Sequence, residues 1–353
     1  MFVVLIFALL LVFLLSGVRV RSSVLPDGAY MSRERTSMIN GFFIWIVFMS
    51  HMIGYGVDLP EADRLVAKII GFLGQCCVAT FFFYSGFGIM ASLRRKGSEY
   101  ACSLVSRRFP MLLLHMTLAV LVFWGVQYLY GSQYEWSRVL LSFVAWDSIG
   151  NSNWFIFVSL SAYLIVAVAY ALGRKLGEVG VISGGILLFI LLIVFLKIHK
   201  GYWWYDTCLC IPAGMLFFVF RPVMERIFAV LRVPVWVYGV LLIPFSLFLY
   251  ISLSRWPYLN NFSAILFALG VTLLFSCVEL KRKPSFLCWC GGSALFYLYI
   301  FQRIPMLIGS KAGWHIGNPF GYQLFCVVGT LVIAWVACKV FPQIDSLIFR
   351  GKS

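Results

Sequence analysis

Charge is scarce in this sequence, and acidic charge is scarcest. Only 12% of the 353 residues are charged, and 13 acidic residues face 28 basic ones. Soluble domains carry about 25% charged residues, and a soluble fold of this length cannot bury a hydrophobic fraction of 62%. The surplus apolar surface has to face lipid or neighbouring transmembrane helices, which excludes a soluble protein.

Several sequence motifs are also missing. Neither a P-loop nor a GxGxxG sequence is present, so ATP-driven transport and dinucleotide chemistry lack support. The ten cysteines contain no CxxC pair with a matching second pair. We therefore expect no metal site, and we interpret most cysteines as apolar packing residues. The net charge of +15 comes without a basic surface domain, so nucleic acid is not an expected partner.

Long apolar runs dominate instead, and they predict an all-α integral membrane protein with about 11 transmembrane helices in one bundle. Arg19 and Arg21 follow the first run rather than precede it, so we expect a retained span with its N-terminus outside. A cleaved signal peptide is the alternative. The apolar segment 139–146 is too short to cross, and we place it at the outer interface. The expected spans are 2–18, 39–57, 69–93, 110–130, 154–172, 179–197, 205–220, 234–253, 261–280, 286–308 and 321–341.

The distribution of basic residues predicts the orientation. With the N-terminus outside, the loops expected in the cytoplasm and the tail, with Lys339 counted in the tail, hold 20 of the 28 Lys and Arg residues. Cytoplasmic loops carry such an excess, so the C-terminus is expected in the cytoplasm. One basic loop contains Arg94, Arg95, Lys96, Arg107 and Arg108. It is either an ordinary positive-inside loop or a clamp for a polyanionic donor, because arginine binds phosphate with paired hydrogen bonds.

His51 is the most conspicuous polar residue within a predicted span. Asn40 precedes it by eleven residues, nearly three helical turns, so the two side chains share one helix face. They can line a tunnel with Asn40 at the cytoplasmic mouth, or His51 can be a packed histidine bonded to a neighbouring helix. His115 is interpreted as an interface residue rather than a phosphate ligand, and Arg303 as snorkelling to the outer interface.

Six segments between about residues 33 and 341 form an ordered series. They are MINGFFIWIVFMSHM (38–52), FFFYSGFGIM (81–90), SRRFPMLL (106–113), NSNWFIFVSLSAYL (151–164), PAGMLF (212–217) and GGSALFYLYIFQRIP (291–305). In the same order, they resemble the motifs of the type-3 membrane acyltransferase family: an opening helix ending in histidine, an aromatic-SGF segment, a paired-arginine and proline motif, a tryptophan-led helix, a glycine-containing helix and a late Ser-aromatic-Tyr-Leu helix.

The resemblance implies a multi-pass protein of a bacterial plasma membrane that transfers acyl groups from cytoplasmic acyl-CoA to cell-surface carbohydrates. Residues 39–341 would form the ten-helix acyltransferase domain, residues 1–38 an added helix and cytoplasmic linker, and residues 342–353 a cytoplasmic tail. By resemblance, His51 takes the place of the family's essential histidine, and Arg107 and Arg108 take the place of its arginine pair.

Two positions depart from the family pattern. Many members have arginine or lysine eleven residues before the histidine, where this chain has Asn40, and many have a late histidine where Gln302 stands. Asn40 keeps hydrogen-bonding capacity but loses the charge, which Arg33 or Arg35 could supply for donor binding. Trp154 and Tyr163 match the tryptophan-led helix as structural residues.

These observations predict an O-acyltransferase in which His51 removes the acceptor hydroxyl proton. Arg107 and Arg108 would hold the coenzyme A phosphates, and Ser85 and Gln302 are candidates for stabilising the oxyanion or positioning the substrate. Acetyl-CoA is expected as co-substrate, without a permanently bound cofactor. The expected partners are the bilayer, acyl-CoA and a carbohydrate acceptor. The alternatives are a transporter or flippase for a carbohydrate or lipid-linked substrate, or a structural or sensory membrane protein.

Overall fold

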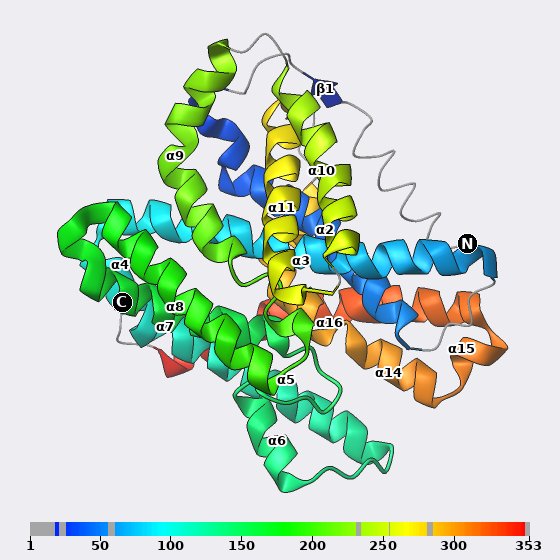
Figure 1. Ribbon diagram of the computed structural model, residues 1–353. Coiled ribbons are helices and arrows are strands. Elements are labelled where there is room, and N and C mark those ends of the chain that lie inside the picture. The colour runs from blue at the N-terminus through cyan, green and yellow to red at the C-terminus, as the bar shows by residue number, and fades with distance from the viewer. Residues whose placement is uncertain are drawn as a thin grey trace.

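The computed structural model is helical almost throughout (Figure 1), and it describes residues 18–20, 26–55, 61–230, 234–253, 255–280 and 285–349. The expected first span, residues 2–18, lies outside these residues except for its last position. The longer α-helices are α2 (Arg33–Ile53), α3 (Glu61–Lys96), α5 (Phe109–Leu129), α7 (Trp154–Gly173), α8 (Gly177–His199), α9 (Cys210–Val230), α10 (Val235–Ser252), α11 (Asn260–Ser276) and α16 (Pro319–Ile348).

Shorter elements connect or interrupt these helices. The shorter α-helices are α4 (Ser98–Ser103), α6 (Trp136–Phe143), α12 (Ser285–Cys290), α13 (Leu295–Phe301), α14 (Arg303–Lys311) and α15 (Trp314–Gly317). A π-helical turn, Leu104–Arg108, joins α4 to α5. Two three-residue strands, β1 (Val18–Val20) and β2 (Val278–Leu280), pair antiparallel with Arg19 opposite Glu279. This pair brings the segment before α2 beside the end of α11.

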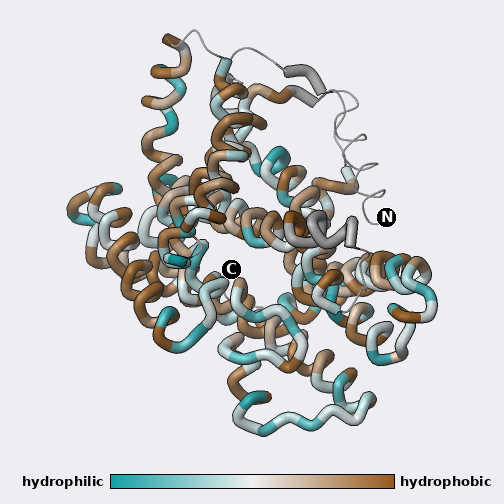
Figure 2. Tube along the Cα trace, turned by 45° about the vertical axis from the view of Figure 1, so that its right-hand side comes forward, coloured by the Kyte–Doolittle hydropathy of each residue, from teal (hydrophilic) through white to brown (hydrophobic). Residues whose placement is uncertain are grey.

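Seven helical stretches in the described part of the chain are long and apolar enough to cross a membrane. One of them, Trp154–His199, is 46 residues long and contains both α7 and α8, which a single 3-10 turn connects. Apolar residues run along the helices and hydrophilic residues gather in several connecting segments (Figure 2). The chain is therefore a helical membrane protein.

The expected span 286–308 is not one helix. It is divided into α12, α13 and α14, with breaks at residues 291–294 and at Gln302. The prediction of a continuous helix was wrong because a Gly-Gly-Ser sequence follows α12, and glycine weakens a helix interior. Interrupted helices are tolerated at membrane depth where they are buried in protein or line a cavity. This interruption therefore marks a region of interest.

Close helix contacts depend on glycine in this bundle. A Cβ atom at Gly41 in α2 would lie 1.9 Å from the Leu287 carbonyl oxygen in α12. A Cβ atom at Gly86 in α3 would lie equally close, at 1.9 Å, to the Ile211 carbonyl oxygen in α9. Small residues allow membrane helices to bring their backbones together where lipid offers no hydrophobic driving force. These contacts fix α2 against the interrupted segment and α3 against α9.

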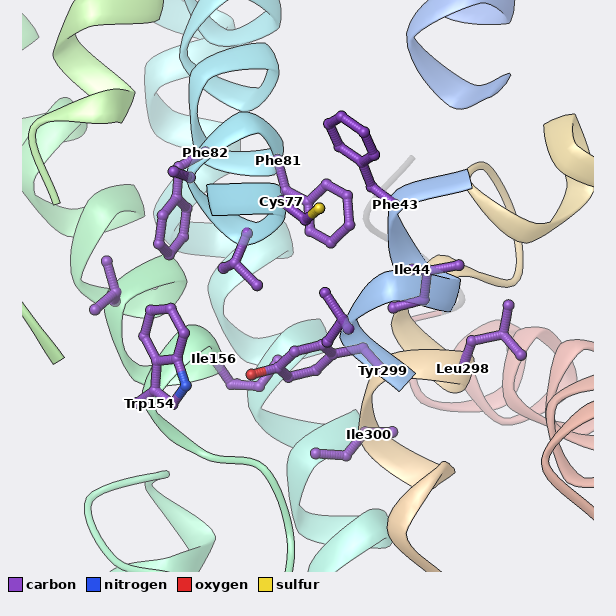
Figure 3. Close-up of a cluster of buried hydrophobic side chains, with 14 of the residues drawn as sticks. Phe43, Ile44, Cys77, Phe81, Phe82, Trp154, Ile156, Leu298, Tyr299 and Ile300 are labelled. Atoms are coloured by element: carbon purple, nitrogen blue, oxygen red, sulfur yellow. The ribbon is translucent and has the colours of Figure 1, made fainter. Parts of the chain in front are cut away.

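Large aromatic side chains fill the core where α2, α3, α7 and α13 meet (Figure 3). Tyr299 of α13 is 1% exposed, and it extends across this core toward Trp154 and Ile156 at the start of α7. Phe82 of α3 stacks on Phe155 with ring centroids 4.9 Å apart. The start of α7 is thus held between α3 and α13.

Replacing Gly41 with Ala is expected to destabilise the fold. The added methyl group overlaps the Leu287 carbonyl, and overpacking of this kind costs about 1–3 kcal/mol. The thermal midpoint of the purified protein in detergent should fall by several degrees. Gly88→Ala is the matched control, because nothing lies within 4 Å of its added Cβ and it also stands in a helix. An unchanged midpoint for Gly41→Ala would contradict the close α2–α12 contact.

Candidate active site

A basic cavity of about 760 Å³ opens among α3, α4, α5 and α7. Its cationic wall consists of Arg95, Lys96, Arg107 and Arg108. The two consecutive arginines belong to the π-helical turn and are both exposed. A cavity lined by several guanidinium groups suits a ligand with several phosphates.

Not every cation of this loop faces the basic cavity. Arg94 forms an ion pair with both carboxylate oxygens of Glu178 at the start of α8 and lies over the Phe218 ring. Lys96 contacts Glu99 at 3.2 Å. In the described chain, neither Arg95, Arg107 nor Arg108 takes part in an ion pair. Their charges are therefore available to an anionic ligand.

His115 lies in the wall of the basic cavity. Its Nε2 is 2.9 Å from Asp345 Oδ1 of α16, and its ring packs against Phe341 with centroids 4.9 Å apart. The helix α16 extends to Ile348, past the expected end of the span at residue 341. The ring is therefore buried against α16, a contact that the sequence did not indicate.

The polar residues on α2 lie outside the lining of the basic cavity. His51 is half-buried, its Nδ1 is buried without a hydrogen-bond partner, and its ring packs on Tyr299 with centroids 6.1 Å apart. Asn40 lies at the glycine contact with α12, where a Cβ on Gly291 would approach the Asn40 carbonyl carbon within 2.7 Å. The backbone at Asn40 and the ring of His51 therefore both adjoin the segment that contains α12 and α13.

Phe155 and Tyr299 connect the two regions. Phe155 lines the basic cavity, and its ring packs against Tyr299 with centroids 4.9 Å apart. Tyr299 is in turn the ring neighbour of His51. One aromatic pair thus separates His51 from the cavity that contains Arg107 and Arg108.

The remaining predicted residues are divided between these regions. Ser85 lines the basic cavity. Gln302 is buried, its Nε2 donates to the Tyr299 carbonyl at 2.9 Å, and its Oε1 has no partner. Arg33 and Arg35 stand in the first turn of α2, and the Arg35 guanidinium donates to the Val278 carbonyl. The structure therefore brings Ser85 together with the arginine pair but does not bring Arg33 or Arg35 to it.

Sequence reasoning missed a group of polar atoms around His51. We call His51, Ser152, Tyr299 and Arg303 the distal polar cluster. His51 Nδ1, Ser152 Oγ, the Tyr299 hydroxyl and Arg303 Nε are all buried without a hydrogen-bond partner in the described chain. Arg303, which was expected to snorkel to the outer interface, has its Nε buried within the protein. The only sequence signal for the burial of Arg303 was the presence of an arginine inside an apolar run.

A second polar cluster ties the segment before α9 to its neighbours. Gln75 of α3 donates to Asp206 Oδ1 at 2.7 Å and to the Trp203 carbonyl at 3.0 Å. Asn261 of α11 donates to the Tyr205 carbonyl at 2.8 Å. These hydrogen bonds give the second polar cluster a structural role, which is to hold the segment before α9 against α3 and α11.

Among the described residues, no group of three His, Cys, Asp or Glu side chains is arranged to hold a metal ion. The polar atoms of the two clusters therefore offer hydrogen bonds and one guanidinium charge rather than a metal-ligand set.

The comparisons with known proteins agree with the helical architecture. An acyltransferase domain family, the type-3 acyltransferases, matches residues 38–339, which is most of the chain. Neither the search of curated proteins nor the search of solved structures gives a match. The chain belongs to this acyltransferase family. It is accordingly a membrane acyltransferase, and the matched region contains the basic cavity and the distal polar cluster.

Proposed function

We propose that this membrane acyltransferase is an O-acyltransferase that transfers an acetyl group from acetyl-CoA to a hydroxyl of a cell-surface or lipid-linked carbohydrate. The observation that carries the proposal is the chain of contacts from the basic cavity through Phe155 and Tyr299 to His51. It supports a reaction in which donor phosphates bind at one end and a histidine acts at the other.

The basic cavity supports the binding of acyl-CoA. Coenzyme A carries its phosphates on the nucleotide part and its thioester at the end of a long, flexible pantetheine arm. Arg95, Arg107 and Arg108 would hold the phosphates, and Ser85 and Phe155 line the same cavity on the route inward. Because the rings of Phe155 and Tyr299 touch, the arm would have to pass beside or between them to reach His51.

His51 would be the general base. A hydroxyl is a weak nucleophile at neutral pH, and a neutral imidazole can take its proton as the oxygen attacks the thioester carbonyl. The carbon–oxygen bond forms, the carbon–sulfur bond breaks, and the imidazolium returns the proton to the leaving thiolate. The unpartnered Nδ1 supports this role, since no described residue occupies that atom. An acyl-histidine intermediate is the other form of the same chemistry.

The proposed topology follows the basic residues. We propose 11 spans with the N-terminus outside, the C-terminus in the cytoplasm and the basic cavity open to the cytoplasm, in a bacterial plasma membrane. The ion pair of Arg94 with Glu178 supports this arrangement by holding the α7–α8 turn beside the cationic loop. Acyl-CoA is a cytoplasmic metabolite, so the cavity would face its source.

His51→Ala is expected to lower acetyl transfer by about two to four orders of magnitude. The measurement is the incorporation of label from acetyl-CoA into surface carbohydrate by a protein expressed at the wild-type level. His199→Ala is the matched control, since His199 stands at the end of α8 against Phe195 and Trp146. Full activity without the His51 ring would remove the proposed base. Absence of any covalent transfer by the wild type would favour the transporter alternative.

Replacing both Arg107 and Arg108 with Gln is expected to raise the KM for acetyl-CoA about tenfold or more, with a smaller effect on kcat. The reason is the loss of charge-assisted hydrogen bonds to phosphate. Arg174→Gln removes a charge from the α7–α8 turn that does not line the basic cavity, and it should leave the KM within about twofold, as surface charges contribute little. Equal effects of the two replacements would contradict a specific donor clamp.

A further inference from the structure

None of the four residues of the distal polar cluster lines the basic cavity. Along the interrupted segment, Phe296 lines the basic cavity, Tyr299 packs on His51, and Arg303 follows four residues later. At about 1.5 Å per helical residue, Arg303 is about 10 Å further along the chain than Phe296. The start of α7 also passes from the cavity to the cluster. Phe155 and Ile156 line the basic cavity, and Ser152, which precedes them in the chain, belongs to the distal polar cluster.

Arg303 has no compensating charge in the part of the chain that the structure describes. No ion pair with a carboxylate includes it, and its Nε is buried without a hydrogen-bond partner. Its guanidinium lies near the His51 ring and the hydroxyl groups of Tyr55 and Tyr299. An unpaired cation at membrane depth costs several kcal/mol, and such residues face a cavity or a partner.

The surrounding groups are donors rather than anions. The Ser152 hydroxyl lies near the Tyr299 hydroxyl, yet neither satisfies hydrogen-bond geometry with any described residue. The hydroxyl of Tyr55, one turn after His51, donates to the Gly150 carbonyl at 3.4 Å. This hydrogen bond joins the end of α2 to the loop that precedes Ser152. A guanidinium with an unpartnered Nε and two hydroxyl groups that can donate to a ligand therefore lie beside the proposed base.

We propose that the distal polar cluster is the acceptor subsite and that Arg303 binds an anionic group of the acceptor carbohydrate. The anion is a carboxylate or a phosphate ester on the same saccharide whose hydroxyl is acylated. Arg303 pairs with it, while Ser152 and Tyr299 donate to neighbouring oxygens and the target hydroxyl lies at His51. This subsite rests on the proposed function, and it adds that the substrate class is acidic saccharides.

The test uses three probes that differ only at C6: methyl α-glucoside, methyl α-glucuronoside and methyl α-glucoside 6-phosphate. Binding to the full-length protein in detergent is followed by titration of tryptophan fluorescence. At least one anionic probe should bind the wild type at least tenfold more tightly than the neutral probe. The anionic probe with the higher affinity shows whether the subsite prefers a carboxylate or a phosphate. Arg303→Gln should abolish this preference and Arg303→Lys should retain part of it.

Lys311→Gln is the matched control, because Lys311 is an exposed cation at the other end of α14. It should leave the preference unchanged. Equal binding of the three probes by the wild type, binding of none, or a preference that survives in Arg303→Gln would each overturn the anion subsite. A labelled acetyl-CoA transfer assay run on the same samples reports separately on the proposed function, because transfer can fail while Arg303-dependent binding persists.

Discussion

The contact of Tyr299 with both His51 and Phe155 is the interaction on which the site depends. Tyr299 belongs to α13, His51 to α2 and Phe155 to α7, so one buried ring joins three elements that are far apart in sequence. The ring can reach both neighbours because α12, α13 and α14 are short and interrupted, which lets the backbone turn inside the bundle. The glycine contact at Gly41 and Leu287 then holds α2 against this segment.

Much of the architecture was predictable from hydrophobic runs. Helices α2, α3, α5, α7, α8, α10 and α11 lie close to the predicted positions because each is a long apolar stretch bounded by polar or turn-forming residues. The interruption of 286–308 was not predicted, since the apolar content of the segment continues across its breaks. Hydropathy reports whether a residue suits lipid, but it does not report whether the backbone stays helical.

The sequence indicated single residues of the candidate site but not their arrangement. His51 and the pair Arg107–Arg108 were predicted from spacing, charge and resemblance, and in the structure they lie in adjoining but separate regions. Contacts such as Phe155 with Tyr299 depend on how helices distant in sequence pack together. Periodicity within one helix carries no information on such contacts. The burial of the Arg303 Nε was not predicted, because an arginine near a span end suits both snorkelling and ligand binding.

The contact between His115 and Asp345 couples the last turns of α16 to the basic cavity. It clamps the wall of the basic cavity to one of the last turns of α16, at a distance of 2.9 Å. Any force or binding event that shifts this turn would be transmitted to the volume proposed for the donor. By reciprocity, filling that volume would change the affinity of the turn for whatever touches it. The last turns of α16 are therefore coupled to the volume proposed for the donor.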